Sequence, residues 1–355
     1  MKSSFIQHSG ISRVLAFVLA LMLCLPLALP AAASENGDVI NIKMVDDLLE
    51  LAENCRLDTW SQGKSMILQA DISLDGVDFQ PIPSFGGTFN GCGHTISGLT
   101  LYDSVTPAGL FGTVQQGGTV KNLTVSGTIS PSGKAENVGG IVGINGGTLR
   151  NCTFTGTIKG KTSVGGIAGM NEVTGKIADC KTSGSMKGEK MTGVIVGCNL
   201  GMVTGCKNNS FINTVSADKT INPENIDLSF VMDMSKLSSL DTRNAATDTG
   251  GIAGYSSGIL GRCTNQGTIG YPHVGYNVGG VVGRSCGYLY SCRNSALVYG
   301  RKDVGGITGQ MEPFIAANMT EDTLGKLQRQ LDELDALMNQ AMEDAGSGWV
   351  PLLPD

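Results

Sequence analysis

The chain has 355 residues, with 25 Lys and Arg against 31 Asp and Glu, and its net charge of −6 argues against a nucleic-acid partner. Glycine supplies 51 residues, whereas aromatic residues make up only 5%. This composition argues against a doubly wound or helical globule and favours many tight turns that join short strands.

The first 33 residues have the pattern of a secretory signal peptide. Lys2 and Arg13 precede an apolar run over residues 14–29, and the small residues 31–33 follow as a cleavage site. A retained membrane anchor is the alternative, but the apolar run is short for that role. We therefore expect an exported chain that begins near Ser34, has 23 basic and 31 acidic residues, and keeps no transmembrane segment after cleavage.

Residues 34–65 are predicted to form an N-terminal cap with a short helix. The segment Val45–Cys55 has apolar residues at helical spacing, and Asp46 and Asp47 lie in its first turn, where negative charge suits the helix dipole. An uncovered sheet edge invites aggregation. We therefore expect the helix to cover the start of the β-rich region that follows.

Residues 66–310 contain a six-residue block, an apolar residue or Thr followed by Gly-Gly-(Ile/Val)-x-Gly. It begins at Val138, Val164, Thr249, Val278 and Val304. A weaker copy begins at Thr192, and the weakest covers residues 107–112. Successive copies start 26–31 residues apart, except for one interval of 57. Residues 207–248 lack the block, which predicts an insertion made of a partial coil and a long surface loop.

A cysteine follows most blocks at a nearly fixed offset. This column of the repeat contains Leu123, Cys152, Cys180, Cys206, Cys263 and Cys292. We expect a stack of buried, reduced thiols, because parallel side chains keep their Cβ atoms farther apart than a disulfide prefers. Disulfides stay the alternative, and ligands in a straight line suit zinc poorly. A second column, Asn145, Asn171 and Asn199, is interpreted as turn residues that tolerate a left-handed backbone.

A unit of about 27 residues with short β segments cannot bury its own apolar face, so it has to stack on copies of itself. We therefore predict an all-β fold, a right-handed parallel β-helix or β-solenoid. The glycine pairs would serve corners with positive φ or with close approach of neighbouring coils. A barrel or a propeller is the alternative, but propeller blades need more residues and a periodic aromatic motif.

Residues 311–355 are predicted to form an amphipathic helix and a tail. Leucine, methionine and alanine alternate in steps of three and four over residues 320–345, and Thr320 can cap the helix. A coiled-coil seam of this length is marginal alone, so we expect the helix to find a partner helix. The natural protein is expected to continue beyond Asp355.

The blocks at Val138, Val164 and Val278, each followed by turns and by Cys-x-x-x-Gly-x-Ile or a close variant, resemble the GLUG motif. Residues 66–101 are similar to the coils that precede such repeats. The resemblance implies a β-helix like that in bacterial cell-surface proteins and in the non-catalytic part of IgA-specific metalloendopeptidases. It implies a scaffold rather than an activity.

No catalytic, cofactor-binding or metal-binding residue is predicted. A zinc protease needs two His four residues apart, and His8, His94 and His273 do not supply them. We interpret His94 as a packing or turn residue. A β-helical lyase or hydrolase needs clustered carboxylates. The acidic residues of the insertion are irregularly spaced and are interpreted as a solvated loop; they are Asp218, Glu224, Asp227, Asp233, Asp241 and Asp248.

We therefore expect a secreted or surface-exposed, non-enzymatic scaffold that serves in adhesion or ligand presentation. Its partner would be a host or matrix glycan or protein. The alternative is a β-helix protein that binds or degrades polysaccharide, an analogy that rests on the fold alone.

Overall fold

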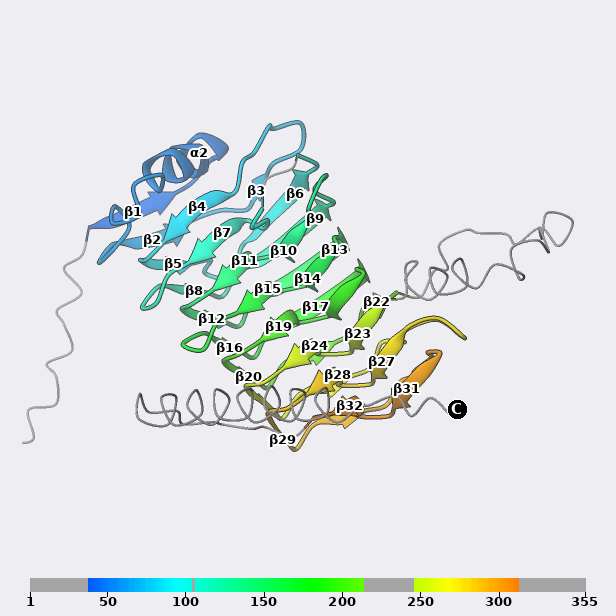
Figure 1. The fold of residues 1–355 in the computed structure, drawn as a ribbon. Helices are drawn as coiled ribbons and strands as arrows, with labels where there is room; N and C mark the ends of the chain where they lie inside the picture. Colours follow the sequence, from blue (N-terminus) through cyan, green and yellow to red (C-terminus); the bar gives the residue numbers. More distant parts are fainter. Residues whose placement is uncertain (1–37, 104–105, 214–245, 313–355) are drawn as a thin grey trace, which may run out of the picture. The chain divides into compact units, whose positions relative to one another are not determined.

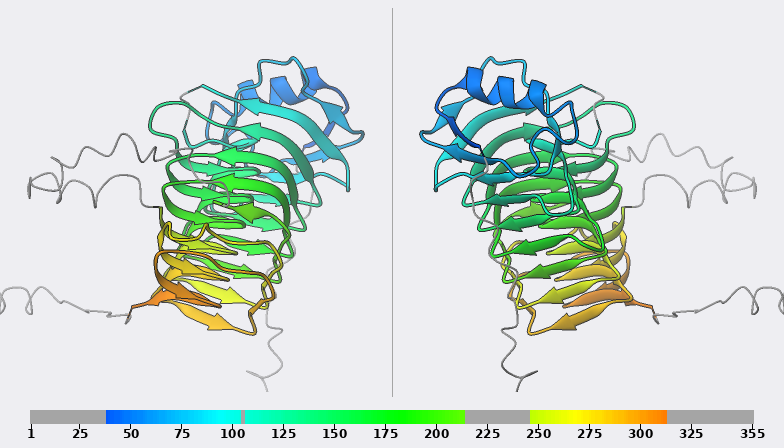
Figure 2. Two further views of the ribbon diagram at one scale, coloured as in Figure 1. Left: turned by 90° about the vertical axis from the view of Figure 1, so that its right-hand side faces the viewer. Right: turned by 90° about the vertical axis from the view of Figure 1, so that its left-hand side faces the viewer.

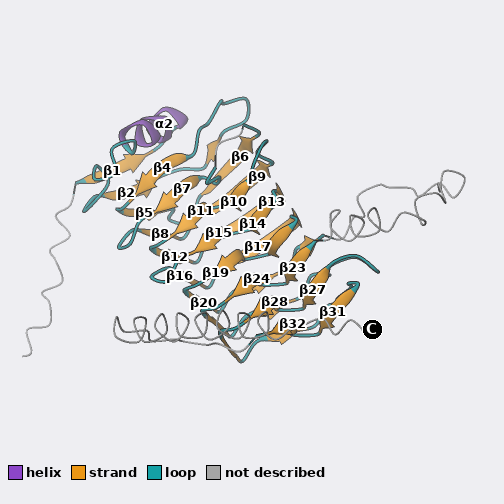
Figure 3. Ribbon diagram, viewed as in Figure 1, coloured by secondary structure: helices purple, strands orange, loops and turns teal. Residues whose placement is uncertain are grey.

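The structure, a computed structural model, describes residues 38–103, 106–213 and 246–312. These residues form one helix and 32 short strands (Figure 3). Every pair of neighbouring strands within the four sheets is parallel, and the strands follow one another in coils from β1 at one end to β32 at the other (Figure 1). The prediction of a parallel β-solenoid is therefore confirmed, and the barrel and the propeller are excluded.

Two sheets have nine strands each. Sheet A contains β1 (Val39–Ile42), β2 (Ser65–Leu68), β5 (Thr88–Asn90), β8 (Thr119–Lys121), β12 (Thr148–Arg150), β16 (Lys176–Ala178), β20 (Met202–Thr204), β25 (Ile259–Gly261) and β29 (Tyr288–Tyr290). Sheet B contains β3 (Ile72–Ser73), β6 (Thr95–Leu101), β9 (Thr124–Ile129), β13 (Thr153–Lys159), β17 (Lys181–Lys187), β21 (Lys207–Asn208), β22 (Phe211–Ile212), β26 (Thr264–Asn265) and β30 (Arg293–Asn294).

The other two sheets carry the six-residue blocks. Sheet C contains β4 (Ile82–Phe85), β7 (Phe111–Val114), β11 (Val142–Asn145), β15 (Ala168–Asn171), β19 (Val196–Asn199), β24 (Ala253–Ser256), β28 (Val282–Ser285) and β32 (Thr308–Met311). Sheet D contains β10 (Glu136–Gly139), β14 (Thr162–Gly165), β18 (Lys190–Gly193), β23 (Thr247–Gly250), β27 (Tyr276–Gly279) and β31 (Lys302–Gly305). Each block from Val138 onward thus ends a strand of sheet D and begins the next strand of sheet C. The coils stack in chain order, from the first coils in blue to the last coils in orange (Figure 2).

The block glycines are required by close approach and not by backbone twist, since none of them has positive φ. A Cβ on Gly139, the first glycine of its block, would lie 2.0 Å from the carbonyl oxygen of Val142. A Cβ on Gly169, the third glycine of its block, would lie 2.4 Å from the backbone of Asn137 in the preceding coil. Of the two roles expected for these glycines, close approach is the one confirmed.

The left-handed corners lie elsewhere, so the left-handed backbone expected for the asparagine column was wrong. The local hydrogen bonding in the turn is present, because Asn145 Nδ2 donates to the carbonyl oxygen of Gly147. One corner residue directly precedes each block, as Asn137 does with φ +53. A second directly precedes each column cysteine, as Asn151 does with φ +52. Asn145, Asn171 and Asn199 are instead the last residues of β11, β15 and β19, and they are 0% exposed.

The predicted N-terminal helix is α2 (Val45–Asn54). The Asp47 carboxylate accepts hydrogen bonds from the backbone N–H groups of Lys43 (2.7 Å) and Met44 (3.1 Å) and so satisfies donors at the helix start. Leu48 and Leu51 are buried in the core that the first coils share. Helix α2 therefore covers the apolar interior at the first coil, as expected.

Three other predictions fall wholly or partly outside the described residues. The signal peptide and the C-terminal helix with its coiled-coil seam lie there. So does most of the insertion over 207–248, although β21, β22 and β23 occupy its two ends. Among the described residues, no helix combines the length and the apolar composition needed to cross a membrane.

Candidate functional site

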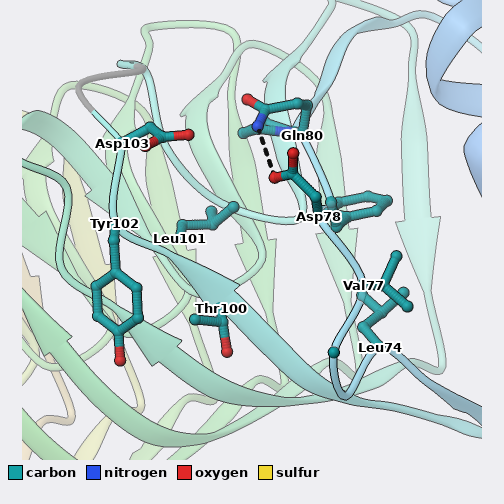
Figure 4. Close-up of a pocket in the computed structure, with 11 residues that line it drawn as sticks. Leu74, Val77, Asp78, Gln80, Thr100, Leu101, Tyr102 and Asp103 are labelled. Atoms are coloured by element: carbon teal, nitrogen blue, oxygen red, sulfur yellow. Dashed lines mark hydrogen bonds between the residues drawn. The ribbon is translucent and has the colours of Figure 1, made fainter.

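A pocket of about 280 Å³ lies between the loop over residues 74–81 and the end of β6 (Figure 4). Leu74, Val77 and Leu101 supply apolar lining, and Thr100, Tyr102 and Gln80 supply polar atoms. The carboxylates of Asp78 and Asp103 come from the two different segments, with Leu101 between them in Figure 4. The pocket therefore combines an apolar floor with polar groups on both sides.

A bulge in β6 builds one wall. The register between β6 and β9 shifts between Ile96 and Leu99, so β6 has one residue more than its partner. Gly98 sits in this bulge with φ +72, and a Cβ there would lie 2.3 Å from a carboxylate oxygen of Asp75. The loop can thus pack against the bulge only because residue 98 has no side chain.

The other wall is the loop that leaves β3. Gly76 has φ +75, and the backbone N–H of Val77 donates to the carbonyl oxygen of Leu74 at 3.0 Å, which closes a tight turn. Phe79 is 2% exposed and anchors the loop in the core. This anchoring leaves Asp78 and Gln80 exposed, with Gln80 Nε2 donating to Asp78 Oδ1 at 3.4 Å.

Tyr102 is one of the lining residues and is 59% exposed, and Figure 4 shows its ring directed away from Asp78 and Gln80. Large apolar surfaces with a polar tip are suited to ligands that are themselves half apolar. A sugar ring presents C–H groups on its face and hydroxyl groups at its edge. An exposed ring beside carboxylate, amide and hydroxyl groups can therefore pack against the first and hydrogen-bond the second.

Two carboxylates in one pocket also suit acid–base chemistry in principle. A glycosidase needs one carboxyl group kept protonated by its surroundings and one kept ionised. The side chains of Asp78 and Asp103 are both exposed to solvent. In this pocket, burial therefore does not distinguish the two carboxylates from one another.

The histidines do not form a reactive centre in the described residues. His94 Nδ1 lies 3.2 Å from Asp71 Oδ1, which also accepts the backbone N–H of Thr95 at 2.8 Å. The Thr95 hydrogen bond, with a smaller effect of His94, lowers the pKa of Asp71. His273 is an exposed turn residue with φ +63, and His8 lies outside the described residues.

Asp248 corrects the interpretation of the insertion carboxylates, because it belongs to β23 and not to a solvated loop. Its side chain is 8% exposed and forms a bidentate pair with Arg284, at 3.1 Å to Nε and 3.2 Å to Nη2. Arg284 also reaches Glu312 at 3.2 Å and lies over the Tyr255 ring, 4.9 Å from its centroid. The cluster ties neighbouring coils together. The other insertion carboxylates lie outside the described residues.

The cysteine column is present. The backbone hydrogen bond from Lys181 to Cys152 and the one from Lys207 to Cys180 stack the cysteines coil on coil. All nine described cysteines are free. Each column thiol donates to the carbonyl oxygen two residues earlier, at 3.3–3.5 Å. No group of three or more His, Cys, Asp or Glu suited to a metal occurs in the described part of the chain.

The family description "The GLUG motif" matches residues 134–159, which run from the loop before β10 to the end of β13. The same strands, corners and cysteine positions recur coil after coil. The chain therefore contains the GLUG motif. The GLUG coils place their glycines and cysteines inside the solenoid, so the motif itself specifies packing.

Two known proteins are similar to this GLUG-motif chain. Halomucin of Haloquadratum walsbyi (strain DSM 16790 / HBSQ001) is 32% identical over 154 residues, which is 39% of this chain and 2% of that protein. The chain thus spans only a small fraction of that relative. The crystal structure of a putative immunoglobulin A1 protease from Bacteroides ovatus superposes with a TM-score of 0.54 at 16% identity, over 77% of this chain and 82% of that one. At that identity the likeness concerns the fold alone.

The pocket at Tyr102 could hardly be predicted from the sequence. Its lining comes from the coils that precede the clear repeats, where no column can be aligned. One signal was available. Gly98 lies inside a strand pattern, and an isolated glycine in a strand is typical of a bulge.

Proposed function

We propose that this GLUG-motif chain is an exported, surface-exposed, non-catalytic module that binds a glycan in the pocket at Tyr102. The observation that carries the proposal is the pairing of an exposed aromatic ring with carboxylate, amide and hydroxyl groups over an apolar floor. At about 280 Å³, the pocket is at the small end of the range for small-molecule sites. This size favours the end of a glycan chain over its middle.

Export and surface exposure rest on the signal-peptide pattern of residues 1–33. The scaffold suits presentation of a ligand site, because stacked coils form a rigid support for a loop that projects from one of them. The pocket loop is anchored at Phe79 and at the β6 bulge. Binding would therefore need little rearrangement of the protein.

The test is a glycan array probed with the purified chain, followed by titration of the strongest glycan. Tyr102→Ala should weaken that binding at least tenfold, because it removes the stacking surface. Tyr288→Ala is the matched control, since Tyr288 is 77% exposed and lies outside the pocket. No bound glycan, or equal losses in the two variants, would refute the proposal.

A second candidate function is glycan hydrolysis, and it rests on Asp78 and Asp103 lining one pocket. In that case Asp78→Asn or Asp103→Asn would abolish release of sugar while leaving the bound glycan in place. In the favoured case neither change affects release, because the unaltered chain releases none. Both changes would weaken binding through lost hydrogen bonds to hydroxyl groups.

A further inference from the structure

We propose that the outer face of sheet B over β13, β17 and β21 binds an acidic polysaccharide through two pairs of stacked lysines. This site is separate from the pocket and does not depend on the function proposed for it. Lys159 and Lys187 form one pair in register, and Lys181 and Lys207 form the other. All four side chains are exposed.

The four lysine side chains point away from the solenoid interior. On β13 and β17 the burial alternates, so Phe154 and Ile158 point into the solenoid while the lysines point outward. Parallel coils lie about 4.8 Å apart. Two ammonium groups repeated at that spacing repel one another, and a counter-charge repeated along the sheet relieves the repulsion.

The described strands of sheet B present no carboxylates beside these lysines. No strand of sheet B in the described residues contains Asp or Glu. Residues 134–213 carry nine Lys and Arg against four Asp and Glu, although the whole chain is acidic. Within the described residues, none of the four lysines forms a salt bridge. The face is therefore a positive strip on a negative protein.

The surface between the two lysine pairs carries hydroxyl groups and one aromatic ring. Lys181 and Lys187 stand at the two ends of β17, about 20 Å apart by the rise of a strand. Between the pairs, the outward positions hold hydroxyl groups, including those of Thr155 and Ser183 in register. Phe211, 55% exposed, pairs with Ser185 on the same sheet. Hydroxyl rows with one aromatic ring between cations match a chain of sugars that bear carboxylates.

Two observations favour an acidic polysaccharide over a nucleic acid. The strip offers one exposed aromatic ring, whereas binding of single-stranded nucleic acid uses several stacked bases. The chain as a whole has a net charge of −6, which opposes a polymer as highly charged as DNA. Carboxylates spread along a polyuronide can meet the lysine pairs with less repulsion from the rest of the protein.

The experiment measures binding of the full chain to polygalacturonate at low salt, with dextran as the neutral polymer and duplex DNA as a third probe. The unaltered chain should bind polygalacturonate and not dextran, and the affinity should fall as salt is raised. K159Q/K187Q should weaken this binding roughly tenfold, whereas K159R/K187R should retain it. Circular dichroism verifies that each variant is folded.

The matched control is K134Q/K176Q, which removes the same charge from exposed positions outside sheet B. It should change the affinity less than twofold. The proposal is overturned if the unaltered chain does not bind polygalacturonate, if dextran binds equally, if DNA binds more tightly, or if the control pair loses as much as K159Q/K187Q. Tyr102→Ala should leave this binding unchanged, which separates the strip from the pocket.

Discussion

Buried asparagines connect the coils inside the GLUG solenoid. Asn145 Nδ2 donates to Asn171 Oδ1 at 2.7 Å, and Asn171 Nδ2 donates to Asn199 Oδ1 at 2.8 Å. Asn171 Nδ2 also donates to the carbonyl oxygen of Gly175 at 3.1 Å, which holds the turn that follows. Each amide therefore joins its neighbours above and below while fixing its own turn, and a buried network of this kind depends on every member.

Asn171→Ala should be strongly destabilising, because it leaves the Asn145 donor and the Asn199 acceptor buried without that partner. We expect a loss of about 2–4 kcal/mol in the free energy of unfolding, measured by urea denaturation. Asn209→Ala is the control, since Asn209 is exposed, and it should change stability by less than about 0.5 kcal/mol. Equal effects would show that the ladder adds nothing.

The thiols of Cys180 and Cys206 in the cysteine column are buried in the solenoid. Burial raises the pKa of the Cys180 and Cys206 thiols well above the usual value. Only a thiolate reacts readily with alkylating reagents. A buried neutral thiol therefore does not react, because the reagent cannot reach it and because it keeps its proton. Cys92, in contrast, is exposed.

Alkylation at pH 8 should therefore label Cys92 in the folded chain, and Cys180 and Cys206 only after denaturation. The raised folded pKa also predicts a pH dependence of stability. The contribution is complete below the unfolded value of about 9.0 and is lost as pH rises above it, because the unfolded state then releases protons that the folded state keeps. Mass spectrometry of labelled peptides gives the first result and urea titration at pH 8 and 10 the second. Column peptides linked by disulfides would contradict both.

At the scale of the repeat element, the glycine block sets how closely two coils approach. The first glycine faces a carbonyl of its own coil and the third faces the left-handed corner of the preceding coil. Both glycines occur in every copy from Val138 onward, including the one in which Val194 replaces the second, whereas Ala108 stands at the first position in the weakest copy. From Val138 onward, the first and third positions of the block therefore require glycine, because a side chain there would collide with backbone atoms.

Gly169→Ala should destabilise the solenoid, because its Cβ would lie 2.4 Å from the backbone of Asn137 and neither coil can move freely. We expect a loss of about 3 kcal/mol, measured as a lower midpoint in urea. Gly306→Ala offers a control in the last block, where a Cβ meets nothing within 4 Å. A tolerated Gly169→Ala would mean that the coils are not in contact there.

The capping helix is the second element with a distinct role. Leu48 is 0% exposed and packs with the residues of the first coils. Leu48→Ala should lower the free energy of unfolding by about 2–4 kcal/mol through the cavity that it leaves. Leu57→Ala, at a position 63% exposed, should have little effect in the same thermal or urea unfolding experiment. Similar losses would show that α2 does not seal the core.

The fold could be predicted from the sequence because its information is repeated: the same glycines, corners and cysteines return in every coil. The asparagine column could be found but not interpreted. Asn suits a left-handed turn and a buried ladder equally, and only the neighbouring coil decides between them. The pocket escaped prediction because it depends on contacts between segments that share no column. Asp248 lies in the column of left-handed corners, directly before the block at Thr249, but its burial against Arg284 of β28 depends on a contact with the neighbouring coil. The lysine strip depends on register, which places Lys159 beside Lys187.

In the whole molecule, the residues that hold the coils together lie inside the solenoid, and the two proposed binding sites lie on its surface. Inside the solenoid, the block glycines, the column thiols and the asparagine amides pack or hydrogen-bond between neighbouring coils. Outside, the exposed pocket at one end and the lysine strip on sheet B remain for ligands. A solenoid can add coils without changing either site, which is compatible with the proposed function as a surface-exposed binding module.

The most direct test of this account is prolonged incubation of the chain with the glycan that it binds best, followed by chromatographic analysis of the sugar. The account predicts saturable binding that Tyr102→Ala weakens, with the glycan recovered intact. Release of sugar by the unaltered chain, lost in Asp78→Asn while binding persists, would contradict it and would make the pocket an active site.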